Sequence, residues 1–188
     1  MDPREIFLSV KEKNLQGLFW KRVQLHPFGA TVHTYLETGG YKHYIGNNLA
    51  GIKCTKGWLK RSISISNGKC VSAKTKEYID GSAKYIDGHF RAYDDIGHFF
   101  LDYSRLIYSY YPVAKANYDC LWGYFAGLHG KWATDPQYFF KLVDVAFSIA
   151  PKVYDVPYIH IFIDDLKKGV EREVLDNEMV AYVEKRLP

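Results

Sequence analysis

A chain of 188 residues is long enough to bury the core of one domain, with or without an appendage. Its 47% hydrophobic and 24% charged residues are the proportions of an ordinary globular protein. The formal net charge of +4 is mild, and no Lys/Arg cluster is dense enough to predict binding of nucleic acid. The sequence contains no run of about eighteen apolar residues, so no membrane-spanning helix is predicted.

Helical spacing of apolar residues dominates the first part of the chain. Asp2-Pro3 has the cap and first-turn proline of a helix start, and Pro27 opens a second helix that runs to Glu37. Gly39-Gly40 ends that helix. The second helix therefore places the carboxylate of Glu37 at its end, before an amide-rich loop that contains Asn48.

Turn signals replace helical spacing between residues 51 and 93. Ile63 to Ser66 alternates in polarity, which is typical of a strand, and we expect a small antiparallel β-lobe of about three strands. Helical spacing returns between Ile96 and Ile149. The predicted fold class is therefore α+β and mainly α. The predicted turns are Asn67-Gly68, Asp80-Gly81 and Asp87-Gly88.

Residues 152–188 form an extension after a main domain that we predict to span residues 1–151. Val156 to Ile163 is a short apolar run, which we interpret as a strand. Asp164-Asp165 then caps an amphipathic helix. We expect this strand and helix to pack on the main domain, while a docking role is the alternative.

The three cysteines do not predict a disulfide framework. Cys54 and Cys70 flank a hairpin and could pair, but the odd count and the absence of an export signal in Met1 to Glu5 favour free thiols. Cys120 lies in an apolar run and is expected in the core. His33 and Glu37 are four apart, yet no third ligand stands at metal spacing, so no metal or other cofactor is predicted.

Glu37 is the first candidate for a catalytic acid. A carboxyl group at the end of an apolar helix can be half buried while it faces a cleft, which raises its pKa and keeps a proton available for a leaving oxygen. Glu77, on the predicted β-lobe, is the candidate for a second carboxylate, and two carboxyl groups across a cleft are the arrangement that glycosidic bond cleavage requires. The ordinary alternative for both is a solvated surface position. The competing carboxylates are Asp80, Asp87, Asp94 and Asp95.

Five short motifs occur in order along the chain. They are Leu36-Glu37-Thr38-Gly39, Asn48-Leu49-Ala50-Gly51-Ile52-Lys53, Thr75-Lys76-Glu77-Tyr78, Phe90-Arg91-Ala92-Tyr93 and Ala133-Thr134-Asp135-Pro136. Together they resemble the bacterial glucosaminidase family of peptidoglycan hydrolases, glycoside hydrolase family 73, which contains flagellar rod hydrolases and autolysins. The resemblance covers about residues 6–149 and implies a lysozyme-like helical domain with a small antiparallel β-lobe flanking the cleft.

The resemblance also implies an activity and a set of site residues. The activity is hydrolysis of the β-1,4 bond between N-acetylglucosamine and N-acetylmuramic acid in peptidoglycan, without a cofactor. Glu37 matches the general acid, and Glu77 matches a second carboxylate. Glu77 either activates water or assists attack by the acetamido oxygen of the substrate. The expected substrate contacts are Trp132, Tyr41, Asn48, Tyr78 and Tyr93.

Three positions depart from the family pattern. Trp132 stands where the family has a tyrosine before Ala-Thr-Asp-Pro, and an indole N–H can donate a hydrogen bond but cannot relay a proton. Gly40-Tyr41 stands where Trp-Gly is common, and we expect Tyr41 to supply the aromatic face. Ala50 replaces a frequent phenylalanine.

Two other functions stay open at this point. A lytic transglycosylase would keep the fold and one acid, while a cell-wall-binding module would have lost catalysis. In each case the expected partner is the peptidoglycan glycan strand, and we expect a monomer. We also expect a soluble protein without a signal peptide, which acts at the cell wall or periplasm after release by a holin, as endolysins do, or by another non-classical route.

Overall fold

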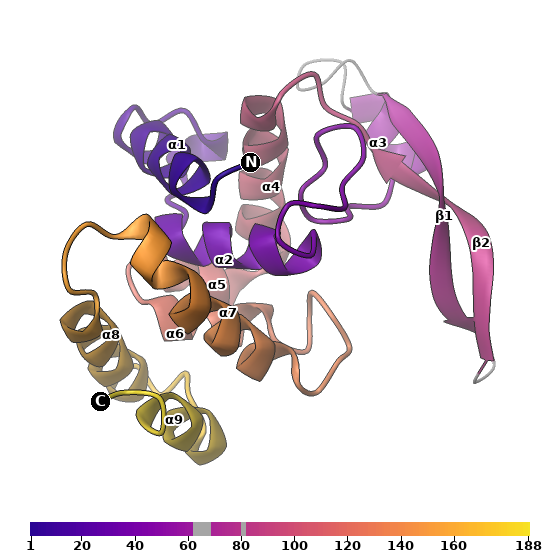
Figure 1. Cartoon of the computed structure of the whole chain (residues 1–188). Coiled ribbons are helices and arrows are strands. Elements are labelled where there is room, and N and C mark those ends of the chain that lie inside the picture. The colour runs from indigo at the N-terminus through magenta and orange to yellow at the C-terminus, as the bar shows by residue number, and fades with distance from the viewer. Residues whose placement is uncertain (62–68, 80–81) are drawn as a thin grey trace. The chain divides into compact units, whose positions relative to one another are not determined.

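The computed structural model describes residues 1–61, 69–79 and 82–188. This part of the chain is mainly helical and contains one two-stranded antiparallel sheet (Figure 1), which confirms the predicted fold class. No helix in the described residues is long and apolar enough to cross a membrane. The helices are α1 (Pro3–Leu15), a 3-10 turn (Trp20–Arg22), α2 (Pro27–Glu37), α3 (Lys56–Arg61), α4 (Ile96–Tyr110), α5 (Pro112–Ala116), α6 (Leu121–Leu128), α7 (Tyr138–Val153), α8 (Ile159–Glu171) and α9 (Asn177–Glu184), and the strands are β1 (Cys70–Ile79) and β2 (Ser82–Arg91).

The chain forms two compact units, which are described separately. The first comprises Met1–Leu36 and Tyr103–Pro188, and the second comprises Glu37–Asp102. Helix α2 is buried on all sides from Phe28 to Thr34, a stretch that lies in the first unit. A helix buried all round belongs to the interior of a domain, and its polar members Thr31 and Thr34 donate their hydroxyls to backbone carbonyls one turn earlier.

The extension after residue 151 is helical, and the predicted strand over residues 156–163 is wrong. Helix α8 begins at Ile159 and buries Phe162 and Leu166, which are four residues apart and share one helix face. A short apolar run cannot be assigned to strand or helix by periodicity alone. Here the helical spacing continues to residue 171, whereas a strand would have ended near residue 163.

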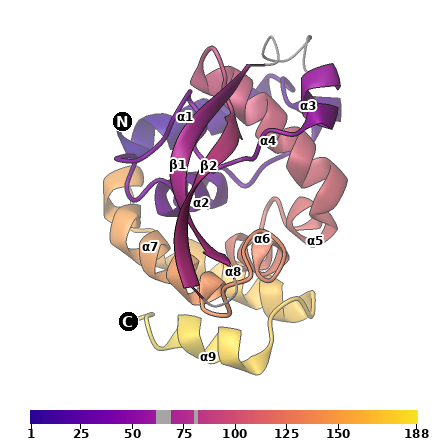
Figure 2. The ribbon, with the colours of Figure 1, turned by 90° about the vertical axis from the view of Figure 1, so that its right-hand side faces the viewer.

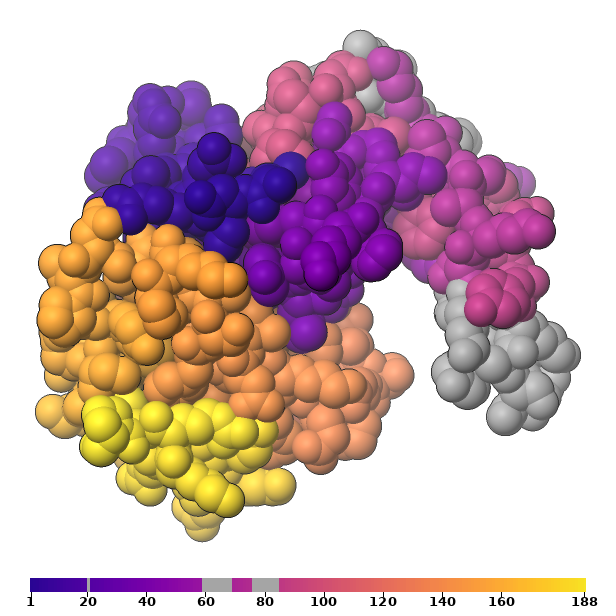
Figure 3. Space-filling view, in the orientation of Figure 1, coloured from indigo at the N-terminus to yellow at the C-terminus, as the bar shows by residue number. Residues whose placement is uncertain are grey.

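Phe162 lies in an aromatic cluster of the first unit. Its ring centroid is 5.0 Å from those of Trp122 and Phe147 and 5.9 Å from that of Phe28. The Trp122 indole N–H also donates to the Phe162 carbonyl at 2.9 Å. Figure 3 shows the segment after residue 160, in yellow, packed against the orange residues that precede it. The extension therefore packs within the first unit, while a domain boundary at residue 151 stays a prediction.

Asp165 joins α8 to the start of α6. Its carboxylate accepts the Leu121 N–H at 2.9 Å and lies 3.5 Å from the His26 imidazole. It thus satisfies a helix N-terminal N–H that would otherwise be unpaired. Burial alone would raise the pKa of Asp165, but the hydrogen bonds from His26 and Leu121 outweigh it, and the pKa is lowered.

We expect Asp165→Asn to lower the free energy of unfolding by about 1–3 kcal/mol at neutral pH, because hydrogen bonds to a charged group are lost. A carboxylate with a depressed folded-state pKa stabilises above its unfolded pKa, about 3.9, and loses that contribution as the pH falls through the folded value. Thermal unfolding of both proteins between pH 3 and 7 tests this. The difference in Tm should shrink below about pH 4, and a constant difference would contradict the assignment.

The second unit is built on a long hairpin. Strands β1 and β2 pair antiparallel from Cys70 opposite Arg91 to Ile79 opposite Ser82, and Figure 2 shows them as one twisted ribbon. Instead of a third strand beside the hairpin, the described residues contain an isolated antiparallel bridge from Lys53 to Phe90 of β2, and a second isolated bridge joins Ile45 to Asn48 in the preceding loop. The predicted turn at Asp80-Gly81 and the alternating segment over residues 63–66, with its turn at Asn67-Gly68, lie outside the described residues.

The predicted turn at Asp87-Gly88 is wrong, because both residues lie within β2. Gly88 is needed there for packing. A Cβ atom at this position would lie 2.8 Å from the Thr75 side chain and 2.9 Å from the Phe90 ring. The missing side chain therefore makes room for the aromatic ring against the hairpin.

A disulfide joins Cys54 and Cys70, whose Cα atoms are 6.0 Å apart. The expectation of free thiols at these positions is therefore wrong. The Cys54 N–H donates to the His89 carbonyl at 2.8 Å, which places Cys54 beside β2 at the same end of the hairpin as the first residue of β1. The sequence alone did not predict this disulfide, because the distance between the two cysteines depends on contacts between residues that are far apart in the chain. Cys120 is buried, as expected.

Candidate active site

Glu37 is the last residue of α2, and its side chain is half buried. The helix ends there because Gly39 and Gly40 have φ values of +56° and +78°, the left-handed region in which glycine is favoured. The carboxylate therefore stands at the carbonyl end of a helix whose preceding turns are fixed in the core. This is the position that the sequence predicted.

Thr38 organises the turn that follows. Its hydroxyl accepts the Tyr41 N–H at 2.9 Å, and its carbonyl accepts the N–H groups of Lys42 and His43 at 3.1 and 3.0 Å. Tyr41 has φ = +60°, a left-handed backbone conformation that residues other than glycine rarely adopt. Tyr41 is only 6% exposed and does not line the pocket described below, so its contact with sugar stays a prediction.

Asn48 holds the next loop together. Its amide group donates to the carbonyls of Ile52 and Arg91, each at 2.9 Å, and its amide oxygen accepts the Ile52 N–H at 3.0 Å. The residue is 2% exposed. These contacts give Asn48 a capping role in the loop, although it also borders the pocket.

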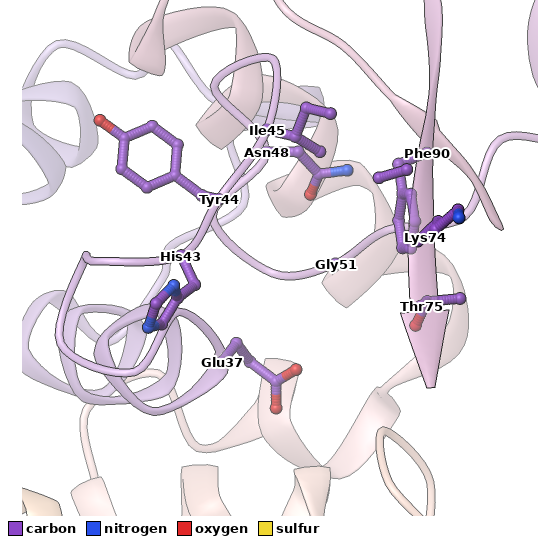
Figure 4. Close-up of a pocket in the computed structure, with 10 residues that line it drawn as sticks. Glu37, His43, Tyr44, Ile45, Asn48, Gly51, Lys74, Thr75 and Phe90 are labelled. Carbon is purple, nitrogen blue, oxygen red and sulfur yellow. The ribbon is translucent and has the colours of Figure 1, made fainter. Parts of the chain in front are cut away.

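A pocket of about 460 Å³ lies within the second unit. Figure 4 shows Glu37 at one side, His43 and Tyr44 on the loop beside it, and Thr75 and Phe90 on the hairpin opposite. Carboxylate, imidazole, hydroxyl and aromatic groups thus surround one cavity, a combination suited to a sugar with polar edges and apolar faces. Its lining consists of Glu37, His43, Tyr44, Ile45, Asn48, Gly51, Ala73, Lys74, Thr75 and Phe90.

The second predicted carboxylate, Glu77, is on β1 and pairs with Lys84 of β2. The side chains of Glu77 and Tyr78 lie outside the described residues, and their roles stay predictions. Two of the competing carboxylates have structural partners. Asp94 pairs with Lys69 at 2.8 Å, and Asp95 accepts the His98 N–H at 2.8 Å at the start of α4.

Tyr93, a predicted substrate contact, is 3% exposed and belongs to a buried polar network. Its hydroxyl donates to the Asp102 carboxylate at 2.8 Å, and burial beside that carboxylate raises its pKa. The same oxygen of Asp102 accepts from the Arg91 guanidinium at 2.6 Å and the Trp58 indole at 3.3 Å. This network ties the end of β2 to α3 and α4, and a contact between Tyr93 and sugar stays a prediction.

Sequence reasoning missed Asp102. The available signal was an acidic residue three positions after Phe99 and four positions before Leu106, inside the apolar spacing of α4. A charge at an apolar-face position of a helix requires a buried partner. Arg91 is that partner, and it is 8% exposed whereas Asp102 is fully buried.

Trp132 lies in the first unit, where its half-buried ring packs among other aromatic residues. Its ring centroid is 4.4 Å from that of His33, in an edge-on arrangement, and 5.3 Å from that of Tyr111. The His33 Nδ1 atom is 2.6 Å from the Tyr103 hydroxyl, and burial lowers the pKa of His33 to about 3. His33 is therefore neutral. Within the described part of the chain, no group of three or more His, Cys, Asp or Glu side chains could hold a metal ion.

The family model of glucosaminidases, described as mannosyl-glycoprotein endo-β-N-acetylglucosaminidase, matches residues 19–149. The chain belongs to the glucosaminidase family. It is thus a glycoside hydrolase of that family, and the assignment expected from the five motifs is confirmed. A comparison with curated proteins gave no match.

Solved structures support the same fold. A peptidoglycan hydrolase mutant from Sphingomonas sp. A1 is 28% identical, with a TM-score of 0.60 over 77% of this chain and 90% of that one. The catalytic domain of the autolysin Auto from Listeria monocytogenes is 24% identical, with a TM-score of 0.60 over 81% and 87%. The glycoside hydrolase domain of FlgJ from Salmonella typhimurium is 18% identical, with a TM-score of 0.57 over 94% and 99%. The last two show likeness of fold, and the lysozyme-like glucosaminidase fold is confirmed.

Proposed function

We propose that this glucosaminidase hydrolyses the β-1,4 bond between N-acetylglucosamine and N-acetylmuramic acid in peptidoglycan. The observation that carries the proposal is Glu37, which lines a pocket of about 460 Å³ at the end of α2 in a chain of this family. The relatives from Sphingomonas and Listeria, a peptidoglycan hydrolase and an autolysin, support the cell wall as the substrate.

In the proposed reaction Glu37 donates its proton to the glycosidic oxygen as the bond from that oxygen to C1 breaks. The carbonyl end of a helix carries partial negative charge, which disfavours a second negative charge and so favours the protonated acid. Water then adds to C1, which gains a hydroxyl, and the proton that the water loses restores the acid form of Glu37, directly or by way of the second carboxylate. The net change is the addition of one water molecule across the bond.

Glu77 has one of two roles in this scheme. It activates the attacking water, or it assists the acetamido oxygen of the substrate, which attacks C1 first and is then displaced by water. Its place on β1 and the match of Thr75-Lys76-Glu77-Tyr78 to the family motif support Glu77 as the second carboxylate. Trp132 is proposed to donate its indole N–H to the substrate, and its place in the motif before Ala133-Thr134 supports this.

The test is to incubate purified peptidoglycan with the full chain, measure new reducing ends and determine the masses of the products. Hydrolysis gives fragments that end in N-acetylglucosamine and carry the added water. A lytic transglycosylase would give anhydro products, and a wall-binding module would sediment with peptidoglycan without releasing reducing ends. The monomeric state and the route to the wall stay predictions from the sequence.

A further inference from the structure

His43 is held over the turn that follows the proposed acid. Its N–H donates to the Thr38 carbonyl at 3.0 Å, so the chain folds back on itself within six residues of Glu37. A Cβ atom on Gly39 would lie 3.3 Å from Cδ2 of His43, so the imidazole packs directly on the glycine. Gly39 therefore has two roles: its left-handed backbone ends α2, and its lack of a side chain leaves room for the His43 ring.

The imidazole is available to a ligand. His43 is exposed and lines the same pocket as Glu37, and Figure 4 shows the two side chains on neighbouring parts of the wall. Its ring nitrogens have no hydrogen-bond or ion-pair partner among the residues that the structure describes. The other titratable groups of the lining are Glu37, Tyr44 and Lys74. A neutral imidazole presents one donor and one acceptor, which matches the hydroxyl and acetamido groups of a sugar.

We propose that His43 hydrogen-bonds the 2-acetamido sugar bound beside Glu37 and strengthens its binding. The inference rests on the proposed function and adds a substrate-binding residue to it.

His43→Ala should raise KM for soluble peptidoglycan fragments about fivefold to tenfold, the effect of one lost hydrogen bond, and change kcat by less than about threefold. The matched control is Lys42→Ala. Lys42 is exposed, donates its N–H to the same Thr38 carbonyl and does not line the pocket. Its KM should equal that of the wild type. An unchanged KM in His43→Ala, or an equal rise in both variants, would overturn the proposal.

His43→Gln tests whether a hydrogen bond is what the imidazole supplies. A glutamine keeps a donor and an acceptor, so we expect it to restore most of the lost affinity. A KM for His43→Gln as high as that of His43→Ala would contradict a hydrogen-bonding role for this side chain.

A binding measurement distinguishes failure of this proposal from failure of the proposed function. In NMR titrations of the wild type with chitotetraose, the His43 ring signal should shift with the sugar concentration. A shift without release of reducing ends would refute hydrolysis and support His43 as a sugar contact. Release of reducing ends by the wild type, with no shift at saturating sugar, would uphold the hydrolase and overturn the role of His43.

Discussion

Glu37→Gln is expected to reduce the release of reducing ends from peptidoglycan by about 10²–10⁴-fold, the usual contribution of a general acid. Glutamine has the size of glutamate and can accept hydrogen bonds, but it has no acidic proton for the leaving oxygen. The pocket and the helix end should therefore survive the change. Reducing-end assays on the purified variant, together with its Tm, test this expectation.

The control for this variant is Glu171→Gln. Glu171 is the exposed last residue of α8, so its loss of charge should leave both activity and Tm unchanged. Full activity in Glu37→Gln would show that another group is the acid. A large fall in the Tm of Glu37→Gln would show that the carboxylate is structural, and the loss of activity would then carry no mechanistic meaning.

Asp102→Ala should lower the free energy of unfolding by about 3–5 kcal/mol, the range measured when one partner of a buried ion pair is removed. Asp102 is fully buried and Arg91 is 8% exposed. The substitution would therefore leave the Arg91 guanidinium almost fully buried without its carboxylate partner. The Tyr93 hydroxyl and the Trp58 indole N–H would lose the same acceptor. Chemical denaturation of wild type and variant measures the difference.

Asp94→Ala is the matched control, because Asp94 pairs with Lys69 at the surface, where side chains are 40% and 60% exposed. Exposed ion pairs contribute at most about 1 kcal/mol. A cost for Asp102→Ala no larger than that for Asp94→Ala would refute the structural role of the network. Replacement of both Arg91 and Asp102 by apolar residues should cost less than Asp102→Ala alone, since no charge remains buried.

The helical class, the hairpin and the position of Glu37 could be predicted from local patterns. Apolar spacing, turn residues and glycines after a helix are signals that span only a few residues, so they can be recognised without knowledge of the rest of the chain. The five motifs added the family, which local spacing could not supply. Glu37 and Asn48 meet at one pocket as expected, although the amide of Asn48 is engaged in the loop.

The errors concern contacts between residues distant in sequence. The disulfide between Cys54 and Cys70 joins residues sixteen positions apart, and no local pattern shows that they are close. The buried charge of Asp102 on α4 is neutralised by Arg91, which comes from β2. The part of the apolar run from residue 159 to 163 is helical, and Phe162 packs there against Trp122 and Phe28. Tyr41 has a left-handed backbone and a buried ring, which the sequence pattern did not predict, and its contact with sugar stays a prediction.

The pairing of Cys54 with Cys70 has a practical consequence for experiments on the two units. The third cysteine, Cys120, is fully buried, and burial raises the pKa of its thiol, which keeps it in the unreactive protonated form. The native protein therefore offers no accessible thiol to maleimide reagents. A variant with one cysteine introduced on α1 and one on the exposed face of β2 can be labelled at both without removing a natural cysteine, and the spectroscopic distance between the two labels can then be measured with and without substrate.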